Sequence, residues 1–111
     1  MDPDHSIIDR PWEYDIVAIR IETSIASSEE PHLDLVLRRD DVVRRLRFFS
    51  PQDIGIEKDL FLQATGGMQI LDTRARQLEG LNVCVSDFEG HQGSITFWAR
   101  DVINLDQTSE G

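Results

Sequence analysis

The side chains best spaced for chemistry lie near the C-terminus, where Asp87, Glu89 and His91 occupy alternate positions. In a continued strand the three would share one face, and carboxylate oxygens together with an imidazole can hold a divalent metal. However, Gly90 and Gly93 favour a turn at this point. We therefore expect a solvated hairpin tip and no metal site. A small metal-dependent protein or enzyme that uses residues 87–91 is the alternative.

Other candidate catalytic groups lack partners. Cys84 falls in the middle of a predicted strand with no neighbouring base, which is typical of a structural thiol. Gly66-Gly67 lies in a segment that matches neither a Walker loop nor a dinucleotide-binding motif. The carboxylate pairs Glu29-Glu30 and Asp40-Asp41 fall in turns, where acidic residues are common. The sequence therefore predicts a protein that is not an enzyme and needs no cofactor.

Basic charge is concentrated in one segment. Residues 38–47 hold five of the eleven basic residues, although the whole chain has a net charge of -10. A single-strand nucleic-acid platform combines such charge with stacking aromatic residues, and exposed aromatics do not alternate with these arginines. We therefore expect no nucleic-acid partner. A charged strand also protects a sheet from edge-to-edge aggregation. Arg45 and Arg47 are candidates for protein binding.

Trp98 and Arg100 are the strongest candidates for partner-binding residues. Alternation places Trp98 on the face opposite Phe97, and pairing Val85 with Phe97 sets Cys84 across from Trp98. An exposed Trp beside an Arg is a common pair of interface anchors. The competing interpretation is that a helix, a loop or the N-terminal arm covers this face.

Alternating hydrophobic residues predict the elements that position these side chains. Strands are expected over residues 14–23, 33–38, 42–49, 68–73, 81–86 and 95–100, with a further short strand at 54–57. In the first strand, Val17, Ile19 and Ile21 form the predicted buried face. Residues 58–64 suit either a single helical turn or a strand, and a helical turn ended by Gly80 is expected at 74–79.

The register of the arginine hairpin follows from its pattern. Pairing Arg38 with Val43 produces one mostly apolar face and one mostly charged face, as a one-sided sheet requires. Arg45 and Arg47 then share the outward face with Asp34. This agreement predicts a two-stranded hairpin with its turn at residues 40–41.

The length of 111 residues predicts one domain. Residues 1–11 form an N-terminal arm, in which Ile7 and Ile8 could dock on the body. Residues 12–105 form a single β-rich domain, and 106–111 form a flexible tail. The predicted class is all-β, an antiparallel sandwich or small barrel of six or seven short strands.

Composition also indicates the compartment and the partner. No apolar run approaches the roughly 18 residues of a membrane span, the first residues lack the features of a signal peptide, and the only cysteine cannot form an internal disulfide. We therefore expect a cytoplasmic protein with no membrane partner. The acidic charge favours a basic protein as the partner, or simply serves solubility.

Three segments resemble a known group of proteins: Leu-Arg-Phe-Phe-Ser-Pro-Gln-Asp-Ile-Gly-Ile-Glu at 46–57, Gly-Met-Gln-Ile-Leu-Asp at 67–72, and Gly-Ser-Ile-Thr-Phe-Trp-Ala-Arg-Asp-Val at 93–102. They are similar to small, acidic, β-rich bacterial immunity proteins of polymorphic toxin systems and to domains of unknown function. The resemblance implies a non-enzymatic binder that occludes a toxin, often a basic one. A self-associating structural β protein is a further alternative.

Overall fold

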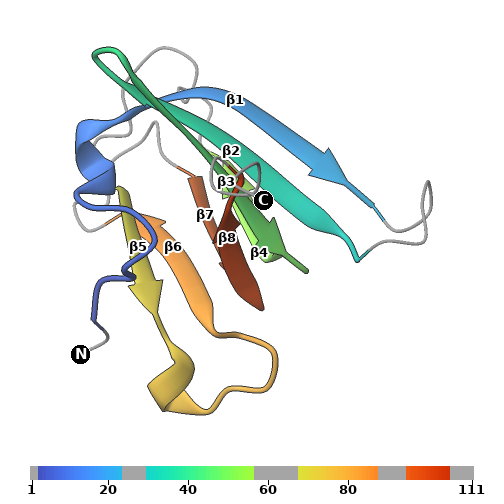
Figure 1. The fold of residues 1–111 in the computed structure, drawn as a ribbon. Coiled ribbons are helices and arrows are strands. Elements are labelled where there is room, and N and C mark those ends of the chain that lie inside the picture. The colour runs from blue at the N-terminus through green and yellow to red at the C-terminus, as the bar shows by residue number, and fades with distance from the viewer. Residues whose placement is uncertain (1–2, 24–29, 57–67, 88–94, 106–111) are drawn as a thin grey trace, which may run out of the picture.

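The computed structural model describes residues 3–23, 30–56, 68–87 and 95–105 (Figure 1). These residues form two antiparallel four-stranded sheets, which confirms the predicted all-β, sandwich-like class. The first sheet has the order β1-β2-β3-β8 and the second has the order β4-β7-β6-β5. The strands are β1 (Asp15–Glu22), β2 (His32–Arg39), β3 (Val42–Phe49), β4 (Gln52–Ile56), β5 (Met68–Asp72), β6 (Val83–Asp87), β7 (Ile95–Ala99) and β8 (Asp101–Asn104). Two short 3-10 turns, η1 (Pro11–Glu13) and η3 (Arg74–Arg76), accompany them.

Both predicted registers are confirmed. Arg38 pairs with Val43 in the β2–β3 hairpin, and Val85 pairs with Phe97 between β6 and β7. In each pair of strands the inward positions are mainly apolar and buried, and the outward positions are exposed or half-buried. The alternation of hydrophobic residues was sufficient to specify these pairings, because a slip of one residue would expose the whole apolar set.

The two sheets are joined at one corner. β3 continues into β4 through Ser50, which has a positive φ of 50°, and β7 continues into β8 through Arg100. The Arg100 backbone N–H donates to the Phe49 carbonyl oxygen at 2.8 Å, and β3 pairs with β8 on one side of the corner as β4 pairs with β7 on the other. A bent two-stranded ribbon therefore belongs to both sheets. β8, beyond the bend, is a strand that the sequence pattern did not predict.

The core lies between the sheets. Phe48 of the first sheet meets Phe97 of the second edge to face, with ring centroids 4.9 Å apart. Around this pair the fully buried side chains are Leu33, Leu35, Leu37, Leu46, Met68, Ile70, Val83, Val85 and Ile95. Since these residues come from both sheets, the aromatic pair joins two apolar layers into one core.

The predicted buried face of β1 is wrong at one position. Val17 is 58% exposed, because a register irregularity between Ile16 and Ala18 places an extra residue in the edge strand. Ile19 packs against the core as predicted, and Ile16 does so in place of Val17. Ile21 remains on the core side but is half exposed at the end of this edge strand.

The N-terminal arm is docked on the body. The Asp72 backbone N–H donates to the Pro3 carbonyl at 2.9 Å, and the His5 N–H donates to the Ile70 carbonyl at 2.8 Å, so the arm pairs along β5. Ile8 and Tyr14 are buried in the core cluster. The arm leaves its place beside β5 and passes through η1 to the start of β1 (Figure 1). Along this path it covers the core between β5 and β1.

Some expectations lie outside the described residues. The predicted tail at 106–111 and the helical turn or strand expected at 58–64 are among these. The predicted turn at 74–79 corresponds to η3, and Gly80 follows it with a φ of 73°. Within the described part of the chain, no helix has both the length and the apolar character required to cross a membrane.

Candidate binding surface

Trp98 lies on the outer face of the second sheet. Its cross-strand neighbours are Cys84 on β6 and Gln52 on β4. The side chain is half-buried, and the Arg76 guanidinium of η3 lies over the ring, 5.7 Å from its centroid. Arg76 thus covers part of the indole, and the distance from its guanidinium to the ring is within the range of a cation–π contact.

Apart from Asp53 at the irregularity of β4, no charged side chain occupies the outward strand positions around Trp98 in the described part of the chain. These positions, which we call the charge-free face, are Gln52, Gly55, Gln69, Leu71, Cys84, Ser86, Thr96 and Trp98. Charged residues make up 29% of the whole chain, so their absence from a row of neighbouring positions is a local property. At the open β4 edge beside this face, Ile54 and Ile56 are 37% and 44% exposed.

Arg100 does not accompany Trp98 on this face. It lies at the corner between the sheets and donates from both Nε and Nη2 to the Glu30 carboxylate, each at 2.8 Å. The Ser50 hydroxyl donates to the same carboxylate at 2.5 Å. The Arg100 guanidinium also lies 5.4 Å from the centroid of the Phe49 ring. Arg100 therefore holds the corner together.

The electrostatics of the corner follow from these contacts. The hydrogen bonds from Arg100 and then Ser50 lower the pKa of Glu30 from 4.5 to about 2. The same carboxylate raises the pKa of Arg100. Both shifts favour the charged forms, so the ion pair is maintained at neutral pH.

Arg45 and Arg47 lie on the outer face of the first sheet, not beside Trp98. Arg47 makes two hydrogen bonds to the Asp34 carboxylate, at 2.8 and 3.0 Å, as the predicted register implied. This outer face carries four arginines and four carboxylates at its described strand positions, so these charges cancel; they are Arg20, Arg38, Arg45, Arg47, Asp15, Glu22, Asp34 and Asp101. The structure thus distributes the four predicted partner-binding residues over two sheets and one corner.

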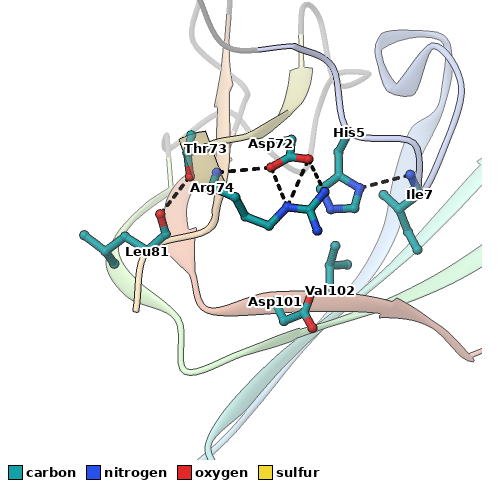
Figure 2. Close-up of polar contacts among 8 residues, drawn as sticks. All are labelled: His5, Ile7, Asp72, Thr73, Arg74, Leu81, Asp101 and Val102. Carbon is teal, nitrogen blue, oxygen red and sulfur yellow. Dashed lines mark hydrogen bonds and ion pairs between the residues drawn. The ribbon is translucent and has the colours of Figure 1, made fainter. Parts of the chain in front are cut away.

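A polar cluster holds the docked arm (Figure 2). Asp72 accepts hydrogen bonds from the Arg74 side chain, including one of 2.9 Å from Nε, and these lower the pKa of Asp72 to about 2. The Ile7 backbone N–H donates to Nδ1 of His5 at 3.1 Å. Burial lowers the pKa of His5, while the nearby Asp72 opposes that shift. No local sequence pattern indicates this cluster, because residues 5 and 72 are brought together only by the pairing of the arm with β5.

The predicted metal tip cannot be assembled from the described residues. Asp87 ends β6, whereas Glu89 and His91 lie outside the described ranges. Within those ranges, no group of three or more His, Cys, Asp or Glu side chains is placed to hold a metal ion. Cys84 is half-buried on the charge-free face and forms no disulfide.

Comparison of the chain with protein-family models, with curated proteins and with solved structures gave no match. The resemblance to immunity proteins therefore stays a prediction.

Proposed function

We propose that this protein is a non-enzymatic protein-binding domain whose interface is the charge-free face centred on Trp98. The observation that carries the proposal is the run of eight uncharged outward positions on four adjacent strands. The cores of protein interfaces are depleted of charged residues, because a buried charge without a partner costs far more than a buried neutral group. A sheet face with uncharged outward strand positions, on a highly charged chain, suits such a core.

The anchor pair on this face is Trp98 with Arg76 rather than with Arg100. Tryptophan and arginine are the residue types most enriched at interface hot spots. Arg76 already lies over the indole ring, so a partner would meet both side chains together. Arg100 is held by Glu30 at the corner and supports the fold near the interface.

The partner is a basic protein. The net charge of -10 would attract such a partner from a distance and raise the association rate. The same charge opposes pairing with a second copy, since both copies carry it. Neutralisation of a basic toxin by occlusion is a role of this kind, and it accords with the sequence resemblance described above.

Two lysine substitutions test the location of the interface. Thr96 is exposed on the charge-free face, and Val43 is 40% exposed on the outer face of the first sheet. Thr96→Lys and Val43→Lys change the net charge equally, so only the position of the new charge differs. The wild type and both variants are used as baits in a lysate of the native host, and captured proteins are quantified by mass spectrometry. The captured partner is then purified and titrated against the wild type and each variant.

We expect Thr96→Lys to weaken the affinity for the partner at least tenfold and Val43→Lys to change it little. Trp98→Ala should also weaken binding, while the far-UV circular dichroism spectrum should stay unchanged because the fold is retained. Equal capture by both lysine variants would exclude the charge-free face. A wild-type dimer in sedimentation that Thr96→Lys converts to a monomer would show that the occupant is a second copy.

A further inference from the structure

A second surface lies away from the charge-free face, between the N-terminal arm and the end of the first sheet. It is a hollow of about 360 Å³, at the lower end of the roughly 300–1,000 Å³ found for small-molecule sites. Its wall includes Ser6, Ile7, Tyr14, Arg39, Arg44 and Asn104. The hollow thus combines apolar surface from the arm with polar groups from three strand ends.

Arg44 is the unusual member of this wall. Among the ten arginines of the chain, all of which fall in the described ranges, it alone makes no hydrogen bond, ion pair or ring contact. It occupies an inward position on β3, directly opposite the buried Leu37. A half-buried guanidinium has lost part of its hydration, and here no carboxylate of the described chain replaces it.

The other charged groups around the hollow limit the charge of a ligand. The Arg39 guanidinium lies 4.9 Å from the Tyr14 ring centroid, and its Nη1 is 2.9 Å from the Glu13 carboxylate, which offsets its charge. Asp9 lies at the rim with its side chain 92% exposed, 3.8 Å from Arg10. Among the described residues, the hollow therefore has one uncompensated positive charge, on Arg44.

We propose that this hollow binds a small organic monocarboxylate through Arg44. A guanidinium matches a carboxylate in a two-pronged hydrogen-bonded pair, and the apolar part of the ligand would lie against Ile7 of the arm. A phosphate dianion fits less well, because only one positive charge is uncompensated and Asp9 repels a second negative charge. This site is independent of the proposed protein interface.

Benzoate is a suitable probe because it combines a carboxylate with a flat apolar body. It is titrated into the ¹⁵N-labelled wild type and into Arg44→Gln and Arg45→Gln while backbone amide shifts are recorded. Arg45 is the matched control, since it is the next residue on β3 and faces the opposite side of the sheet. We expect saturable shifts around Tyr14 and Arg44 in the wild type and Arg45→Gln, and at least tenfold weaker binding to Arg44→Gln.

Two analogues separate charge from shape. Neutral benzamide should bind at least tenfold more weakly than benzoate, and phenyl phosphate should bind no better than benzoate. Equal binding of benzamide, tighter binding of phenyl phosphate, unsaturable shifts, or unchanged affinity in Arg44→Gln would each overturn the proposal. If Arg44→Gln does not fold, Arg44→Lys replaces it. The lysine keeps the positive charge but lacks the two-pronged donor geometry of the guanidinium, so the same tenfold loss of benzoate affinity is expected. An unchanged affinity in Arg44→Lys would equally refute the assignment.

Discussion

Glu30 should contribute measurably to stability because it joins the two corner connections of the sandwich. Its carboxylate accepts two hydrogen bonds from Arg100, which precedes β8, and one from Ser50, which precedes β4. Glu30→Ala removes all three contacts. Glu30→Gln removes the charge but keeps an amide oxygen that can accept from one of the two donors.

The magnitude can be worked from these contacts. A partly exposed ion pair contributes roughly 0.2–1 kcal/mol, and a hydrogen bond contributes about 0.5–1.5 kcal/mol. We therefore expect Glu30→Ala to lower the free energy of unfolding by about 2 kcal/mol and Glu30→Gln by about 1 kcal/mol. Glu22 provides a control, since its side chain is 32% exposed against 33% for Glu30. Among the described residues, the ion pair of Glu22 is with Arg20 on its own strand. Glu22→Ala should therefore lower the free energy of unfolding by less than about 0.5 kcal/mol.

Urea unfolding followed by tryptophan fluorescence measures these differences, and it avoids the salt screening that guanidinium chloride would add. The dependence on pH is a second check. The folded pKa of Glu30 is about 2, below the ordinary 4.5, so its contribution is present above pH 4.5 and is lost as the pH falls through about 2. The stability difference between the wild type and Glu30→Ala should therefore shrink over that window.

Two results would refute this reasoning. One is a loss in Glu30→Ala no larger than that in Glu22→Ala, which would show that the corner contacts contribute no more than a surface pair. The other is a difference from the wild type that stays constant between pH 4.5 and 2, which would show that the charge of Glu30 is not responsible.

Two further predictions concern the arm and the core. Burial lowers the pKa of His5 below 6.5, so its contribution is present above pH 6.5 and is lost as the pH falls through the lower folded pKa. Amide hydrogen exchange should accordingly show the arm opening more readily at pH 5 than at pH 7 in the wild type, and an equal pH effect in His5→Asn would contradict this. In the core, Phe48→Ala removes the edge-to-face partner of Phe97 and should cost about 3–5 kcal/mol in urea unfolding; a loss below about 1 kcal/mol would mean that the two sheets do not depend on this contact.

The sequence was sufficient to predict those parts of the fold that depend on alternation. The registers of the arginine hairpin and of the β6–β7 pair followed from their apolar faces, and so did the inward direction of Arg44. The irregularity at Val17 was not predictable, since an extra residue in an edge strand leaves no clear mark in a run of aliphatic residues. Alternation also cannot show where a strand leaves one sheet for another, as at Arg100.

The candidate site was predicted less completely, because it depends on contacts between distant segments. The position of Trp98 on an outer face followed from its strand. Its contact with Arg76 depends on where η3 lies after β5, which no local pattern specifies. Likewise, whether Arg44 has an ion-pair partner depends on every side chain that lies near it in the fold. The residues next to it in sequence do not reveal this.

The bent ribbon at the corner has a consequence for the order in which the chain folds during synthesis. The first sheet needs β8, which pairs with β3 and is made only after the other three strands of that sheet and after the whole of the second sheet. Until residues 101–104 leave the ribosome, the free edge of β3 stays unpaired and open to wrong partners. The domain therefore becomes complete only when nearly all of the described chain has been synthesised.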